Sequence, residues 1–135
     1  MAVSGEPVSG GAPAVGSEGV AALFERALAL HRAGHLQQAR TGCEQLLAQH
    51  PDHAEAWHLL GLIAFQLGDP ARAAEWFSRC IGLAPGNAAA HANLGVALDA
   101  LQRPHEALAS YGRAIAIDPH CADAHFNRGN LLHRL

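Results

Sequence analysis

Residues 54–87 have the sequence AEAWHLLGLIAFQLGDPARAAEWFSRCIGLAPGN, and residues 88–121 repeat its pattern as AAAHANLGVALDALQRPHEALASYGRAIAIDPHC. Matching positions lie 34 residues apart and include a proline, an alanine and a glycine each time: Pro51, Pro85 and Pro119; Ala39, Ala73 and Ala107; Gly61, Gly95 and Gly129. Each unit of such a chain can bury its apolar face only against the next one. The period therefore predicts a stack of helical hairpins that works by binding.

Two amphipathic helices are predicted within residues 54–87. The larger apolar residues of the first half keep a step of three or four, and a second stripe of this kind begins at Ala73. Between the stripes, Gly68 can end one helix, Asp69 can cap the next, and Pro70 suits its first position. The same reasoning predicts helices at 20–33, 36–49, 54–67, 70–83, 88–101, 104–117 and 122–135.

Other local signals concern the helix starts and the distance between helices. Asp52 and Glu55 have the spacing of a capping box in front of the third helix, and Asn87 can cap the fifth. The small residues Gly61 and Ala73 let paired helices approach closely, so a bulky replacement there is expected to cost roughly 1–3 kcal/mol. The two helices of a hairpin are therefore predicted to lie in close contact.

The recurring residues resemble the tetratricopeptide repeat signature. In residues 54–87 that signature consists of Trp57, Leu60, Gly61, Ala64, Ala73, Phe77, Cys80 and Pro85. The third repeat has His91 at the tryptophan position, and the first departs most at Arg26 and Cys43. The resemblance implies an all-α, right-handed α-solenoid of antiparallel helix pairs at 20–135, with repeats at 20–53, 54–87 and 88–121 and a partial repeat at 122–135.

The composition favours one helical domain behind a tail. Half of the residues are hydrophobic and the net charge is −3, as in ordinary globular chains. Residues 1–19 are rich in Gly, Ser, Ala, Pro and Val, so we expect a flexible N-terminal tail there. Residues 1–19 lack a basic segment followed by a continuous apolar stretch, so they make a poor secretory signal. The longest apolar run elsewhere, 59–65, is too short to span a bilayer. We therefore expect a cytoplasmic protein without a membrane partner, and abundant alanine and arginine without lysine indicate a bacterial source.

The sequence lacks the motifs of the main enzyme classes. It has no Gly-x-Ser-x-Gly elbow, no glycine-rich phosphate loop and no His-Glu-x-x-His pair. Acidic residues outnumber basic ones by 12 to 9, which disfavours a nucleic-acid partner. We therefore expect no catalytic residue, no cofactor and no metal within these residues, and a protein or peptide as the partner.

Three cysteines and ten histidines each allow two interpretations. Cys43 and Cys80 stand where the repeat pattern has a small apolar residue, which favours reduced structural thiols over disulfide or catalytic ones. Cys121 stands at a turn, and we expect it to oxidise most readily. His35, His50, His53 and His120 fall at helix ends or turns, which favours structural or solvated roles over a zinc site. His91 and His125 share one repeat position, where we expect them to pack in the hairpin interface, and a role in sensing pH stays open.

The family resemblance implies a groove formed mainly by the first helix of each repeat. Carried over position by position, the residues expected to bind a peptide are Phe24, Leu28, Glu55, His58, Leu62, Phe65, Asn93, Val96, Asp99, Asp123, Phe126, Asn127 and Asn130. They combine an apolar floor with acidic edges, which suits a peptide or a partner helix. The alternative is that some of the apolar side chains only pack between adjacent first helices.

Two function hypotheses follow from this groove. The carboxylate clamp of chaperone-binding family members is absent, because the matching positions hold no lysine or arginine. Asn93 and Asn127 are instead similar to the asparagine ladder in the repeat region of protein O-linked N-acetylglucosamine transferases, which Glu25 and Leu59 interrupt here. We expect a peptide-binding scaffold or, as the alternative, the substrate-recognition region of a larger enzyme such as a glycosyltransferase of this type.

The last predicted helix, at 122–135, differs from a typical cap. Capping helices of solenoids have polar outer faces, whereas Leu131, Leu132 and Leu135 crowd one end of this helix. We therefore expect the natural protein to continue into further repeats, and this chain either to fray after about residue 121 or to self-associate through its last helix.

Overall fold

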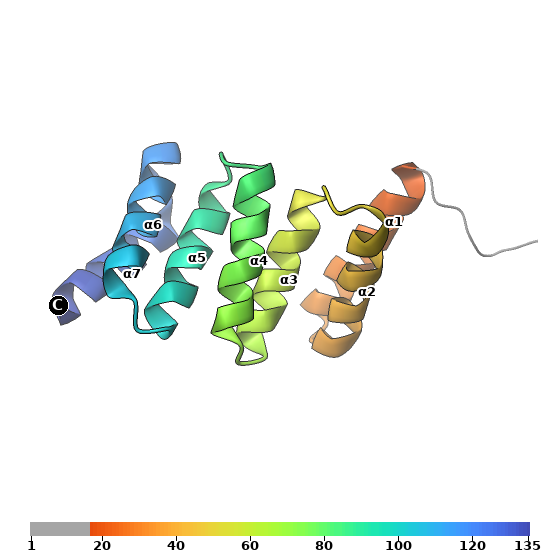
Figure 1. Cartoon of the computed structure of the whole chain (residues 1–135), viewed down its shortest axis with the longest axis horizontal. Coiled ribbons are helices and arrows are strands. Elements are labelled where there is room, and N and C mark those ends of the chain that lie inside the picture. Colours follow the sequence, from red (N-terminus) through yellow and green to blue (C-terminus); the bar gives the residue numbers. More distant parts are fainter. Residues whose placement is uncertain (1–16) are drawn as a thin grey trace, which may run out of the picture. The chain divides into compact units, whose positions relative to one another are not determined.

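The computed structural model describes residues 17–135, and within this range it contains seven α-helices and no strand (Figure 1). They are α1 Ser17–Arg32, α2 Leu36–Gln49, α3 Ala54–Gln66, α4 Pro70–Leu83, α5 Ala88–Ala100, α6 Pro104–Ile117 and α7 Ala122–Arg134. The all-α prediction is confirmed, and six helices match their predicted bounds to within one residue. α1 begins three residues before its predicted start at Val20, and residues 1–16 of the predicted tail lie outside the described residues.

The helices fall into two compact units, which divide after His50. The first unit contains α1 and α2, which pack against each other. The second unit contains α3 to α7, and each of these helices packs against the next along the chain (Figure 1). α3 also contacts α5, and α5 contacts α7. The first helices of the second unit therefore form one layer, and α4 and α6 lie against it.

The predicted signals between α3 and α5 are confirmed. Gly68 has a φ of +87°, a left-handed conformation that favours glycine and ends α3. Asp69 Oδ1 accepts a hydrogen bond from the Arg72 amide at 3.1 Å, and Pro70 occupies the first turn of α4. Asn87 Oδ1 likewise caps α5. These starts and stops depend on residues only a few positions apart, so the local sequence is sufficient to predict them.

The predicted capping box in front of α3 is wrong. The N-cap of α3 is His53, whose Nδ1 accepts a hydrogen bond from the Ala56 amide at 3.1 Å. An N-cap side chain bonds the second or third amide of the helix. Because α3 begins at Ala54, Asp52 stands one residue too early for this role.

A ring N–H closes the turn in front of each first helix of the second unit. Trp57 Nε1 donates to the Pro51 carbonyl (2.8 Å), His91 Nε2 to that of Pro85 (3.1 Å), and His125 Nε2 to that of Pro119 (2.8 Å). A carbonyl oxygen only accepts, so both imidazoles carry a proton on Nε2. The expected burial in the hairpin interface is confirmed for His91 and wrong for His125, because no second helix covers α7 within the described residues.

Glycines bring the paired helices of the second unit close together. A Cβ added at Gly61 would lie 2.6 Å from a ring atom of Phe77, and one at Gly95 would lie 2.5 Å from a ring atom of Tyr111. Both rings are buried members of core clusters. The close approach predicted at Gly61 is therefore confirmed, and the packing holds the first helices in a fixed layer.

Candidate functional site

Most of the expected groove residues lie on one layer of the second unit. We call the following set the first-helix face: Glu55, His58, Leu62 and Phe65 of α3; Asn93, Val96 and Asp99 of α5; Asp123, Phe126, Asn127 and Asn130 of α7. Phe24 and Leu28 are half-buried on α1, which belongs to the first unit. They are therefore described apart from this set, and their part in peptide binding stays a prediction.

The apolar residues of the first-helix face differ in exposure. Phe65 is 37% exposed and Phe126 is 68% exposed, so both rings are accessible to a ligand. Leu62 and Val96 are half-buried and pack against the core clusters around Phe77 and Tyr111 respectively. The alternative of a packing role therefore applies in part to Leu62 and Val96, and much less to the two phenylalanines.

His58 and Asn93 join α3 to α5 across the face. Their Nε2 and Nδ2 atoms lie 2.9 Å apart, and because an amide nitrogen only donates, His58 Nε2 accepts and its proton lies on Nδ1. The imidazole also meets the Phe77 ring edge to face, with centroids 5.6 Å apart. Burial lowers the pKa of His58, which favours the neutral ring. One amide proton of Asn93 is thus occupied within the protein.

Asp99 and Arg134 join α5 to α7 in the same way. Arg134 Nη2 donates to Asp99 Oδ2 at 2.5 Å. Both cross-repeat pairs have a separation of 35 residues, one repeat plus one residue. Burial, reinforced by the Asp99 charge, raises the pKa of the nearby Tyr111 hydroxyl to about 12. The pairing neutralises Asp99, one of the predicted acidic edges.

The remaining polar groups of the face carry negative charge and hydrogen-bonding capacity. Within residues 17–135, neither Glu55 nor Asp123 takes part in an ion pair. Asn127 is half-buried, and Asn130 is exposed. The face therefore presents two free carboxylates and two amides beside its apolar rings.

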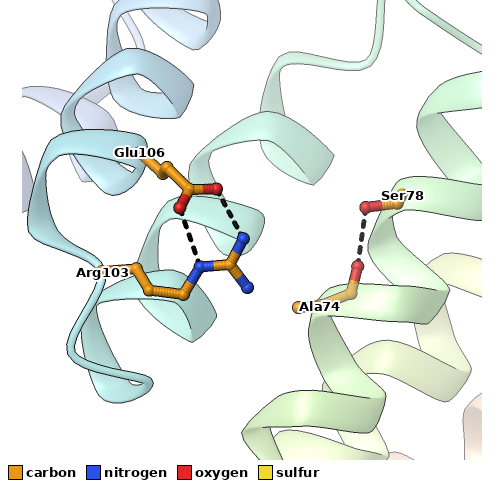
Figure 2. Close-up of polar contacts among 4 residues, drawn as sticks. All are labelled: Ala74, Ser78, Arg103 and Glu106. Carbon is orange, nitrogen blue, oxygen red and sulfur yellow. Dashed lines mark hydrogen bonds and ion pairs between the residues drawn. The ribbon is translucent and has the colours of Figure 1, made fainter.

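A cleft that the sequence analysis missed lies on the second helices. It has a volume of about 470 Å³ and runs between α4 and α6 over the leucines of α5. At the start of α6, its wall includes two hydrogen bonds from the N-cap Arg103 to Glu106, and on α4 the Ser78 hydroxyl donates to the Ala74 carbonyl (Figure 2). The family resemblance assigns the groove to the first helix of each repeat, so it gave no indication of a cleft between the second helices.

The titratable groups give no sign of a reactive centre in the part of the chain that the structure describes. No group of three or more His, Cys, Asp or Glu side chains there could hold a metal ion. Burial raises the pKa of Cys43 to about 12 and also raises that of Cys80, so neither thiol is activated as a nucleophile. Cys121 is only half-buried. No helix from α1 to α7 is long and apolar enough to cross a membrane.

Two models of known protein families match this chain. A tetratricopeptide repeat model matches residues 24–88, and a second model of the same repeat matches residues 100–135. This chain belongs to the tetratricopeptide repeat family. The solenoid of helix pairs expected from the sequence is therefore shown, and this fold generally serves as a protein-interaction scaffold.

Similar proteins include a tetratricopeptide domain solved with a bound peptide and two enzymes. The first tetratricopeptide domain of Spaghetti (RPAP3), solved with an HSP90 peptide, has a TM-score of 0.84 at 20% identity over 89% of this chain and 95% of that one. A Thermobaculum terrenum O-GlcNAc transferase mutant has a TM-score of 0.80 at 32% identity over 84% of this chain and 22% of that one. The probable biofilm formation methyltransferase WspC of Pseudomonas putida is 32% identical over 68 residues, 50% of this chain. The match spans only 16% of that methyltransferase.

Proposed function

We propose that this chain is a scaffold that binds a peptide segment of a partner protein on the first-helix face, and that it is not itself a catalyst. The observation that carries the proposal is the exposure of Phe65 and Phe126 on a layer of helices that the core holds in place. When a peptide covers exposed aromatic rings beside half-buried aliphatic side chains, the rings lose their water. Anchor points of this kind dominate the binding energy of peptides.

The charges of the face indicate the chemistry of the peptide. Glu55 and Asp123 are negative and unpaired within the described residues, so basic side chains of the ligand would lie beside its apolar ones. The amides of Asn127 and Asn130 can bond the backbone of an extended segment. We therefore expect an apolar and basic peptide whose affinity falls as salt is added.

Substitution of the central ring tests the proposal. Peptides are first selected from a displayed random library against the unchanged chain, and their affinities are then measured by titration. Phe65→Glu should weaken the selected peptides by about tenfold or more, because it places a charge at the apolar anchor. Leu67→Glu is the matched control, since Leu67 is 38% exposed on the same turn but faces another side of the helix end.

The control separates a binding effect from a folding effect. Both variants should keep the helical circular dichroism of the unchanged chain, and only Phe65→Glu should lose the peptides. Selected peptides that bind the Phe65→Glu chain as tightly as the unchanged chain would contradict the assignment of this face.

A second candidate function is that of the recognition region of a larger enzyme. Two matches at 32% identity, to the O-GlcNAc transferase and to the methyltransferase, support it, because this chain corresponds to a small part of each. Determining the coding sequence beyond Leu135 tests this candidate. A transferase domain in the same reading frame would support it, and a frame that contains repeats alone would count against it.

The cytoplasm remains the compartment that we propose for this chain. Cys43, Cys80 and Cys121 are all free in the structure. Reduced cysteines are the normal state of cytoplasmic proteins, so their presence supports this placement. Fractionation of cells that express the chain with a small tag would test it.

A further inference from the structure

Three glycines stand at the same position of α3, α5 and α7, and only two of them are covered. A Cβ added at Gly61 or Gly95 would collide with the ring of Phe77 or Tyr111, whereas one added at Gly129 would meet no atom within 4 Å. In both hairpins of the second unit an aromatic ring thus fills the space above this glycine. α7 presents the same space open to solvent.

The helices that fill these spaces share a pattern of residues. Each has a small residue four positions before the ring and another three positions after it: Ala73, Phe77 and Cys80 in α4, and Ala107, Tyr111 and Ala114 in α6. α7 has the same pattern in Ala122, Phe126 and Gly129. In α4 and α6 all three residues are buried, whereas in α7 all three are exposed. α7 therefore carries both an open glycine and a free ring at the spacing that fills such a glycine.

The exposed side of α7 is presented by a helix that is itself held in place. Leu131 is buried in the core cluster around Tyr111, and Arg134 pairs with Asp99 of α5. These contacts fix the rotation of α7. Phe126, at 68%, is the most exposed large apolar side chain of the described residues, and Leu132 beside Gly129 is 49% exposed.

We propose that α7 pairs antiparallel with α7 of a second copy of this chain, each Phe126 ring lying over Gly129 of the other copy. A two-fold axis makes the contact reciprocal, so one surface supplies both the ring and the glycine. Glycine lets the two helices approach closely, as it does in the hairpins.

In a second copy, α7 is better able than α4 or α6 to place a ring over Gly129. The rings of Phe77 and Tyr111 are each 1% exposed and already cover Gly61 and Gly95. Residues 1–16 contain no aromatic residue. The pairing is argued from Gly129 and the ring spacing, so it does not rest on the proposed peptide function. Phe126 also belongs to the first-helix face, so the dimer would compete with a peptide at α7 and leave Phe65 and the rest of α3 free.

Light scattering and sedimentation of the purified chain over a wide range of concentrations test the pairing. We expect a dimer whose dissociation constant rises about tenfold or more in Phe126→Ala, which removes the ring, and in Gly129→Ala, which fills the space for it. Gly129→Ala should not unfold α7, because alanine favours helices. Phe65→Ala and Gly112→Ala are matched controls on exposed positions elsewhere, and both should leave the dimer unchanged.

Hydrogen exchange locates the contact independently of the variants. Amides of α7 should exchange more slowly as the concentration rises, and those of α3 should not change. A chain that is monomeric at every concentration, or a dimer that survives both substitutions, would overturn the proposal. It would also be overturned by a monomer that binds an isolated peptide of residues 104–117 and loses it on Gly129→Ala, because the open space would then accept a separate helix.

Discussion

The hairpin of the first unit and the hairpins of the second unit fill the space between their paired helices with different side chains. In the α3/α4 pair, Gly61 lies under the large ring of Phe77, whereas the matching positions of the α1/α2 pair hold Ala27 and Cys43. All of these residues are buried. Ala27 is larger than Gly61, and Cys43 is smaller than Phe77, because the two side chains of each pair share the space between the paired helices.

The smaller pair brings its helices together at another point. Gly42 of α2 faces α1, and a Cβ added there would lie 3.5 Å from the Cβ of Ala27, an ordinary contact distance. Gly42 is therefore packed less tightly than Gly61, where the added Cβ would lie 2.6 Å from the Phe77 ring. We therefore expect the two units to respond differently when the matching positions are changed.

The largest expected difference comes from removing the buried side chain itself. Phe77→Ala should lower the free energy of unfolding by roughly 3–5 kcal/mol, because it leaves a cavity the size of a ring. Cys43→Ala removes a single sulfur atom and should cost only about 1 kcal/mol. Urea unfolding followed by circular dichroism measures both, and equal losses would mean that the two hairpins do not differ in the way described.

A smaller effect is expected from the glycine. Gly61→Ala should destabilise the chain by roughly 1–3 kcal/mol, because its methyl group collides with the Phe77 ring. The control Gly112→Ala has open space around it and should stabilise the chain by about 0.5–1 kcal/mol, since alanine is the better helix former.

Combining substitutions sharpens the comparison between the units. The double variant Gly61→Ala/Phe77→Cys carries the residue pair of the first unit in the second. Its loss should be smaller than the sum of the two single losses, with a coupling of about 0.5–3 kcal/mol. Additive losses in the same unfolding assay would show that the two positions do not share one space.

The smallest expected effect is a dependence on pH that involves His58, which lies against the Phe77 ring. Burial holds its pKa below the ordinary value of 6.5, so the unfolded chain takes up the proton first as the pH falls. The contribution of His58 to stability is therefore complete above pH 6.5 and is lost as the pH falls toward the folded pKa. Protonation would also place a donor opposite the Asn93 amide.

Thermal unfolding at neutral and mildly acidic pH measures the contribution of His58 to stability. His58→Gln should show a smaller loss of stability on acidification than the unchanged chain, because glutamine has no proton to gain. His105→Gln, at an exposed position of α6, is the control for the other histidines and should behave like the unchanged chain. If all three proteins lose the same stability, His58 has no special part in the acid response.

For the candidate site, the sequence predicted which apolar side chains are exposed but not which polar side chains bond one another. The sequence placed Phe65 and Phe126 at positions that proved exposed, because a helix keeps its faces over many turns. It also selected Asn93 and Asp99 as groups facing a ligand, but it did not predict that each bonds a residue of a neighbouring repeat. Those bonds depend on the rotation and offset of neighbouring helices, which no local pattern specifies.

By itself, the amino-acid sequence determined the period, the seven helices and most of their ends. These features rest on interactions between residues at most a few positions apart, such as Asp69 with the Arg72 amide, or on a repeat that makes every hairpin bury the same face. The tertiary structure alone decided which groups meet across repeats, including His58 with Asn93, and where space stays open, as above Gly129 and between α4 and α6. Such contacts depend on distances between helices of a few ångströms, and those distances are set only when all side chains pack together.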